Sequence, residues 1–373
     1  MCAMQAETSA STSGPQEEEP VDESESVPGI HKLPNEILHK IFSYVTDGRT
    51  LLKVIPAVCR RWKKAVSDRA AWHGVSVAVQ ANRWNPSIER AILKRAPAVR
   101  SLHVSLTDPP PLPGTRRNDR FLCALRGLIV FEELSIERVP PVWLRKAYLQ
   151  LVWRSRHHLK RLDMALDSTT KTNRGHSSLH VLSQVPNLED LTLYVEDDFV
   201  YEVGKLQQCF PNLKSIHVKE DVITPKQHDL VKDLLVGSLV CAKFYPSPSA
   251  RPDLLTALAM CRGLAHLSVQ SGFAPVFRSL PALTSIYIYH TVESPAEINL
   301  LWRVIESLYT PTVHKVHVVV WCNFFGESAF TLGGECRKGV EAMREKGFCG
   351  KISYQISLVK THTGARLLTY ATL

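Results

Sequence analysis

The residue types that could do acid–base, nucleophilic or metal chemistry are scattered along this chain of 373 residues. It has nine cysteines, but they include no C-x-x-C pair, and His157-His158 lacks the spacing of a chelating pair. No nucleophile elbow or helical H-E-x-x-H motif is present, and Gly333-Gly334, with no lysine at phosphate-loop spacing, is better explained as a turn. The sequence therefore predicts no catalytic site, no metal site and no cofactor.

The residues with a recognisable spacing are apolar, and they begin just after Ile30. Pro34 suits a first helical turn, where its missing N–H costs nothing. Five apolar residues then recur at helical spacing on one broad face: Ile37, Leu38, Ile41, Phe42 and Val45. Thr50 is a candidate cap for a second short helix, and Val58, Trp62 and Val66 mark a third. Three short helices in about 45 residues rarely supply a complete core of their own, so we expect another surface to cover them.

This unit resembles the F-box over the full length of that motif, near residues 31–75. The matching elements are the Leu-Pro start, the Leu51-Leu52 pair, the segment Val58–Trp62 (VCRRW) and Trp72, although Arg49-Thr50 replaces the acidic residue often found before the Leu-Leu pair. The resemblance implies binding to a Skp-type adaptor and, through it, to cullin-RING machinery. The candidate adaptor-binding residues that match motif positions are Leu33, Pro34, Ile37, Leu38, Ile41, Phe42, Val58, Cys59 and Trp62. The alternative for each is a place in the domain's own core, above all for Val58 and Trp62.

The rest of the chain is repetitive. Short segments of L-x-x-L-x-L type have their centres at residues 102, 134, 162, 191, 216, 242, 267, 286 and 316, and a weaker tenth lies at Ile352–Leu358. Apolar helical stretches lie between them, at Val142–Leu151, Leu179–Val185, Asp229–Val236, Leu254–Met260 and Ile298–Leu308. This resembles an irregular leucine-rich repeat, without the asparagine ladder of regular repeats. The register near 242, 286 and 354 stays open, and a β-sandwich is the alternative.

The predicted fold class is therefore α/β: a small all-α F-box of three helices, followed by an irregular leucine-rich-repeat solenoid of about nine or ten repeats. The domain boundaries that we expect are a disordered acidic tail at 1–28, the F-box at 29–75, the solenoid at 76–360 and a C-terminal tail at 361–373. Two segments break the repeat rhythm, the proline-rich loop Asp108–Arg120 and the long stretch Trp321–Gly350, either as functional loops or as tolerated insertions.

Alternation along the repeat strands sends one set of side chains inward and the other onto an exposed face. The exposed set is rich in aromatic and imidazole groups, which suit protein recognition. Candidate substrate-binding residues on this face are His103, Tyr194, His217, His266, Tyr287, Tyr289 and His317. The alternative is a merely solvated sheet, with the substrate site on the C-terminal loops.

Charge is divided unevenly along the chain. Of 45 basic and 36 acidic residues, seven acids and no base lie in residues 1–28, so residues 29–373 carry a net charge of +16. No stretch approaches the ~20 apolar residues of a membrane span, so we expect a soluble intracellular protein, cytoplasmic or nuclear, without a membrane partner.

The predicted function is a non-enzymatic adaptor that recruits an unknown protein substrate to an SCF-type ubiquitin ligase. The alternatives are a ligase-independent scaffold and, less favoured, a basic nucleic-acid-associated repeat protein.

Overall fold

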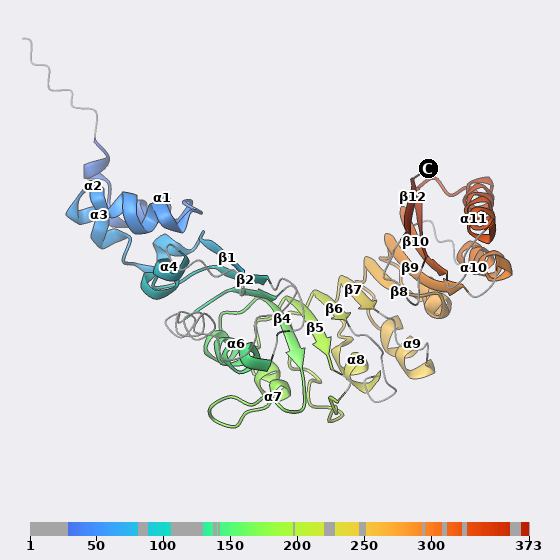
Figure 1. Cartoon of the computed structure of the whole chain (residues 1–373), viewed down its shortest axis with the longest axis horizontal. Helices are drawn as coiled ribbons and strands as arrows, with labels where there is room; N and C mark the ends of the chain where they lie inside the picture. The colour runs from blue at the N-terminus through green and yellow to red at the C-terminus, as the bar shows by residue number, and fades with distance from the viewer. Residues whose placement is uncertain are drawn as a thin grey trace, which may run out of the picture.

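The chain is seen here in a computed structural model, in which a helical unit at the N-terminal end leads into a long curved sheet (Figure 1). The structure describes residues 29–80, 89–105, 130–136, 140, 142–196, 198–219, 228–245, 251–292, 295–307, 312–322, 327–358 and 367–372. The acidic tail predicted at residues 1–28 and the proline-rich loop predicted at 108–120 lie outside these ranges.

The N-terminal helical unit follows the predicted apolar spacing. Its α-helices are α1 (Asn35–Ser43), α2 (Ile55–Val58) and α3 (Arg60–Ala65). The short helix η1 (Ile30–Lys32) precedes α1, η2 (Thr50–Val54) lies between α1 and α2, and η3 (Arg69–Trp72) follows α3. Pro34 was predicted in the first turn of this helix, and it is the N-cap of α1, one position before that turn. The cap predicted at Thr50 is wrong: the Asp47 carboxylate lies before η2 and accepts hydrogen bonds from the backbone N–H groups of Arg49 and Thr50, at 3.0 and 3.1 Å. A carboxylate satisfies these free donors directly.

Within the residues that the structure describes, twelve strands form one sheet in strict chain order. Strands β1 to β11 are parallel, each paired with the next in the sequence, and β12 closes the row antiparallel to β11. Their bounds are β1 Ser76–Gln80, β2 Ser101–Ser105, β3 Glu133–Ile136, β4 Arg161–Leu166, β5 Asp190–Val195, β6 Ser215–Lys219, β7 Cys241–Tyr245, β8 His266–Gln270, β9 Ser285–Val292, β10 Lys315–Cys322, β11 Lys351–Leu358 and β12 Leu367–Thr372. Each unit thus adds one strand and returns to start the next.

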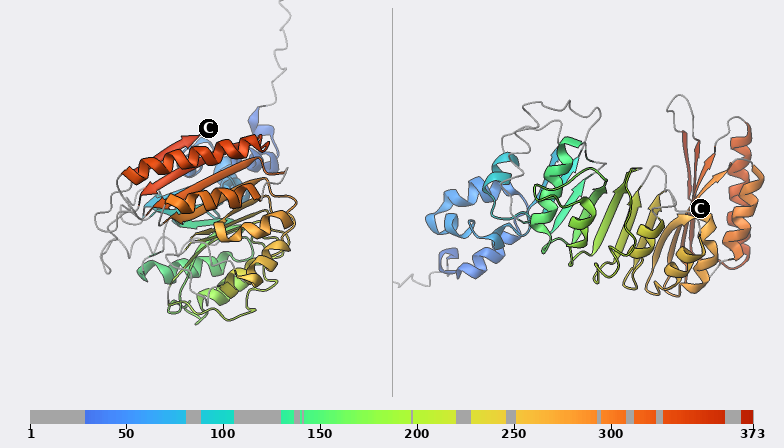
Figure 2. Two further views of the ribbon diagram at one scale, coloured as in Figure 1. Left: turned by 90° about the vertical axis from the view of Figure 1, so that its right-hand side faces the viewer. Right: turned by 90° about the horizontal axis from the view of Figure 1, so that it is seen from below.

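The returns between parallel strands carry the helices, because a parallel pair needs a crossover connection. They are α4 (Glu89–Arg95), α6 (Val142–Ser155), α7 (Ser178–Ser183), α8 (His228–Leu234), α9 (Pro252–Ala259), α10 (Pro295–Ser307), α11 (Glu327–Glu345) and the 3₁₀ helix η5 (Ser271–Ser279). The helices lie along the outer side of the arch and the strands line its inner side (Figures 1 and 2). The five predicted helical stretches are all found here.

A column of apolar residues on the helix side of the sheet forms part of its core. In this column the predicted repeat centres pair with one another directly, as Leu102 does with Leu134 and Ala242 with Leu267. This pairing fixes the register at 242 and 286, which the sequence left open, and it places Ile352 rather than Tyr354 beside Val316. The members are Val77, Leu102, Leu134, Leu162, Leu191, Ile216, Ala242, Leu267, Ile286, Val316 and Ile352, all buried.

The core of the helical unit is continuous with that of the sheet. Trp72 is 2% exposed, and its indole N–H donates to the Val66 carbonyl at 2.6 Å. Gly74 lies so close to α1 that a Cβ atom there would come within 2.2 Å of the Ser43 carbonyl oxygen. A side chain at position 74 would therefore push the helical unit away from β1. The buried residues from Leu38 to Ile356 form a single hydrophobic cluster.

The structure differs from the sequence-based expectation at both ends of the sheet. Residues 367–372, assigned to a C-terminal tail, form strand β12, and β1 adds a strand before the first predicted repeat. The stretch 321–350 contains α11, and Gly333-Gly334 lies inside that helix, so the predicted turn is wrong. Glycine weakens a helix by only about 1 kcal/mol, and packing of α11 against α10 and β11 outweighs that cost.

Candidate partner-binding surfaces

One side of α1 exposes large apolar side chains. Ile37 is 46% exposed and Ile41 39% exposed, and with Tyr44 they follow the i, i+4, i+7 spacing of a single helical stripe. Val58, at the end of α2, is 51% exposed. Isoleucine and valine are usually buried, so an exposed stripe of this kind indicates a surface that another molecule covers.

The other predicted adaptor-binding residues have different positions. Leu38 and Phe42 face the opposite way and are buried in the core. Cys59 caps α3, since its Sγ accepts a hydrogen bond from the Trp62 N–H at 3.4 Å. Trp62 is half-buried and meets the Phe42 ring edge-on, with centroids 5.3 Å apart. The alternative that Val58 fills the core is wrong, because Val58 is exposed, while Trp62 packs partly against the core.

The Leu33-Pro34 start of the motif is held in place by Arg61 of α3. The Arg61 guanidinium donates from Nε to the Asn35 side-chain oxygen at 3.0 Å and also donates to the Leu33 carbonyl. Pro34 is exposed and Leu33 half-buried. The segment before α1 is therefore fixed at the surface.

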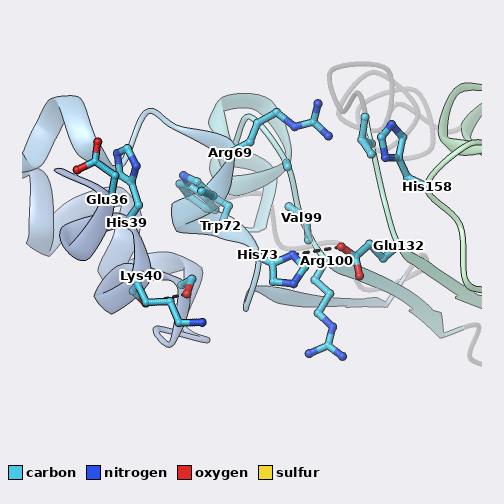
Figure 3. Close-up of a pocket in the computed structure, with 14 residues that line it drawn as sticks. Glu36, His39, Lys40, Arg69, Trp72, His73, Val99, Arg100, Glu132 and His158 are labelled. Carbon is cyan, nitrogen blue, oxygen red and sulfur yellow. Dashed lines mark hydrogen bonds and ion pairs between the residues drawn. The ribbon is translucent and has the colours of Figure 1, made fainter. Parts of the chain in front are cut away.

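A third side of α1 faces a cleft of about 610 Å³ between the helical unit and the turns that precede β2, β3 and β4 (Figure 3). Its walls carry Glu36, His39 and Lys40 from α1, and across the cleft the His73 Nδ1 lies 3.1 Å from the Glu132 carboxylate. This polar side of α1 is separate from the exposed apolar stripe.

Comparison with known families agrees with this geometry. A protein-family profile described as F-box-like matches residues 30–78. Residues 30–78 are an F-box-like domain. A search of curated proteins finds no match to the chain.

The F-box-like domain exposes more apolar surface than the motif alone indicated. Val54 and Tyr44 are 57% and 71% exposed and were not among the candidates. The i+7 spacing of Tyr44 from Ile37 was a usable signal, whereas the exposure of Val54 depends on how η2 packs. Residues 30–78 hold nine Lys and Arg against three Asp and Glu, a net charge of +6. The stripe therefore lies on a basic domain, which favours a partner with an acidic surface.

The second candidate surface is the face of the sheet turned away from the helices. It lies on the inner side of the arch (Figures 1 and 2), and we call it the outward face because its side chains point away from the core. Ile286 and Val316 point to the opposite side, where they line a small cavity with Ile305 of α10 and Met343 of α11. The residues that alternate with them therefore face outward. All seven predicted substrate-binding residues lie on the outward face: His103 and His266 are exposed, and His217, Tyr287, Tyr289 and His317 are half-buried.

Tyr194 corrects the prediction of an exposed side chain. It is only 7% exposed, because its hydroxyl donates to the Ile136 carbonyl at 3.1 Å and the Lys219 ammonium lies over its ring, 5.0 Å from the centroid. Neighbouring strands thus cover it, an effect that alternation within one strand does not reveal.

Burial and neighbouring charges shift the pKa values of two groups on the outward face. Burial raises the pKa of Asp163, although the Ile136 N–H donates to its carboxylate at 3.3 Å. Burial, followed by the charges of Lys219 and Lys243, lowers the pKa of His217 from its ordinary value to about 4. His217 is therefore neutral at physiological pH and leaves the positive charge of this region to the lysines.

We expect acidification to destabilise the wild-type chain more than a His217→Gln variant. Because the pKa of His217 is about 4 in the folded chain and near 6.5 when unfolded, the unfolded chain takes up a proton first as the pH falls. The contribution of His217 to stability is complete above pH 6.5 and is lost progressively down to pH 4. Thermal unfolding midpoints measured across this range check the effect. His266→Gln, an exposed histidine on the same face, is the control, and equal slopes for all three proteins would contradict the prediction.

Neither surface holds a cluster suited to metal chemistry. Within the ranges that the structure describes, no three His, Cys, Asp or Glu side chains are placed to share a metal ion. Among the helices it describes, none combines the length and the apolar character needed to cross a bilayer. The described residues thus present two candidate binding surfaces, one on the helical unit and one on the sheet.

Proposed function

We propose that this chain is the substrate-recognition subunit of an SCF-type ubiquitin ligase. In this proposal the F-box-like domain binds a Skp-type adaptor, which links it to the cullin-RING machinery, and the sheet region binds the protein substrate. F-box-like domains act in protein–protein interaction, often in SCF complexes. The two candidate surfaces lie on different parts of the chain, as a bridging role requires.

The observation that carries the proposal is the exposed apolar stripe of α1. Leu38, Phe42 and Trp72 already supply the helical unit with a buried core shared with the sheet. Ile37, Ile41 and Val58 nevertheless stay in solvent. Because their burial by a partner would stabilise a complex by roughly 25 cal/mol for each Å² of apolar surface, this stripe is the natural adaptor site.

We further propose that the sheet region is built of leucine-rich repeats. One short strand in each unit, a buried apolar column in register across the units, and helices confined to the other face are typical of that class. Stacking is the only way in which such short units can bury their apolar residues, so the repeats act as one rigid support for the outward face.

In this role the chain has no catalytic step of its own. It would hold substrate lysines near a charged ubiquitin-conjugating enzyme and so raise their effective concentration. We place this activity in the cytoplasm or the nucleus.

Reconstitution from purified components tests the proposal. The full chain, a Skp-type adaptor and a cullin-RING complex are expected to co-elute in size-exclusion chromatography. A complex with the adaptor that excludes the cullin would instead support a ligase-independent scaffold. If the chain elutes alone in the presence of excess adaptor, the proposed function is wrong.

A further inference from the structure

The outward face of β6 to β11 has a one-sided charge. These six strands contain no Asp, Glu or Arg. Their outward positions include Lys219, Lys243, Lys315, Lys351, His217, His266, His317, Tyr287 and Tyr289. We call this surface the lysine face. Strands β3 to β5 differ, because Glu133, Asp163 and Asp190 lie among their residues.

The lysines of this face form two pairs, Lys219 and Lys243 on β6 and β7, and Lys315 and Lys351 on β10 and β11. Lys219 donates to the Tyr194 hydroxyl at 3.2 Å and also interacts with the charge of Asp163 on β4. Lys315 and Lys351 are direct partners on neighbouring strands, and like charges in that arrangement repel. Lys243 is the direct partner of His217 on β7, and Lys219 lies two residues further along β6 on the same face, while His217 itself is held neutral. In the part of the chain that the structure describes, none of these four lysines forms an ion pair with a carboxylate.

Cations at the start of β4 and in the turns before β4 and β6 form ion pairs with acids of the same chain. Lys160 lies 3.3 Å from the Glu132 carboxylate, and Lys214 lies 2.6 Å from that of Glu189. Arg161 pairs with Glu133 in the same way. Intramolecular acids therefore neutralise that edge of the sheet, whereas the lysine face keeps charge that an external acid could neutralise.

Aromatic rings and one small buried residue lie beside these lysines. The Tyr287 and His317 rings lie 5.1 Å apart, and the Lys315 ammonium lies 5.2 Å from the Tyr287 centroid. Between Lys243 and Tyr287, in the same row, is Ser268, a small residue only 4% exposed. Flat rings beside a small residue offer room for an extended chain, and amphipathic rings contact both its backbone and its side chains.

We propose that the lysine face binds an extended segment rich in Asp and Glu on the protein substrate, an inference that rests on the proposed role as a substrate receptor. The recognition would come from carboxylates placed between the lysine ammonium groups. Phosphate is usually recognised by the planar fork of arginine, and these strands have none. Nucleic acid is disfavoured as well, because the affinity of nucleic-acid binders depends on the number of phosphates that they neutralise, and four lysines offer few such contacts.

Fluorescence anisotropy with the purified full chain tests this directly. The probes are a labelled 20-residue peptide with eight glutamates, the same peptide with glutamines, a phosphoserine peptide of equal total charge, and an oligothymidylate. The glutamate peptide is expected to bind at 50 mM salt, to weaken several-fold at 200 mM, and to bind more tightly than the other three probes. No binding at 50 mM salt, or tighter binding of any other probe, would overturn the inference.

Paired lysine variants locate the site. Lys243→Gln with Lys315→Gln is expected to weaken the glutamate peptide about tenfold, from two partly screened contacts. The control is Lys232→Gln with Lys338→Gln, which removes two charges from exposed positions on α8 and α11 and is expected to change affinity less than twofold. Equal weakening by both pairs would reduce the effect to net charge and refute the site. Adaptor co-elution is measured on the same proteins, so a failure of the ligase role with peptide binding intact remains distinguishable from a failure of this site.

Discussion

Glutamate in place of both Ile37 and Ile41 is expected to abolish binding of the Skp-type adaptor while the chain stays folded. Both side chains are exposed on α1, and neither belongs to the buried cluster. The change should therefore cost little stability, because surface substitutions usually lie within about 0.5 kcal/mol. In a complex, however, each carboxylate would be moved from water into an apolar contact without a partner.

The expected loss exceeds a hundredfold in affinity. The apolar contact of two isoleucines and the desolvation of two carboxylates together amount to about 3 kcal/mol or more. Isothermal titration with purified adaptor measures it, and circular dichroism and thermal unfolding report the fold. Leu300→Glu, at a 62% exposed leucine on α10, makes the same kind of substitution outside the domain and should leave adaptor binding unchanged. Adaptor binding by the double variant within threefold of wild type would refute the adaptor site on α1.

The second large effect concerns Trp72, where the F-box-like domain joins the sheet. Trp72→Ala is expected to lower the free energy of unfolding by about 3–5 kcal/mol, the range for removing a large buried aromatic side chain. Part of that loss is the hydrogen bond to the Val66 carbonyl. Trp72→Phe keeps most of the packing and leaves that carbonyl without its donor, so it should cost only about 1–2 kcal/mol.

Urea unfolding of the full chain measures these differences. Trp153→Ala is the matched control, since Trp153 is a half-buried tryptophan on α6 that contacts Arg156 and His176 at the surface, and its loss should cost less than Trp72→Ala. A loss below about 1 kcal/mol for Trp72→Ala would show that the junction contributes little. The continuous core also means that deleting residues 29–75 would remove part of a hydrophobic cluster that the sheet region shares, so point variants are the sounder test of the domain.

For the F-box-like domain, the residue types were predictable from the sequence, but which of them are buried and which are exposed was not. The motif located all nine candidates on or beside α1, α2 and α3. Neighbouring positions then took opposite roles, with Leu38 buried and Ile37 exposed. Both are aliphatic and both fit a broad helical face, so only the direction from which η3 and α3 pack against α1 separates them.

The sheet shows the same limit. The repeat centres predicted most of the register, because each strand must turn its apolar residues to the helices, but they left it open near 242, 286 and 354. β12 could not be predicted, since an isolated six-residue segment becomes a strand only when β11 offers it backbone partners. Tyr194 could not be placed either, because its burial comes from Ile136 and Lys219 on other strands.

The sequence by itself thus predicted a small helical domain with F-box spacing, followed by a row of strand-and-helix units whose register it left open at three places. Those properties follow from local periodicity, which a short stretch of chain already contains. Only the tertiary structure decided which apolar residues remain in solvent and which cations lack a neutralising carboxylate. Exposure and charge pairing depend on groups that meet from distant parts of the chain, and no local pattern records those meetings.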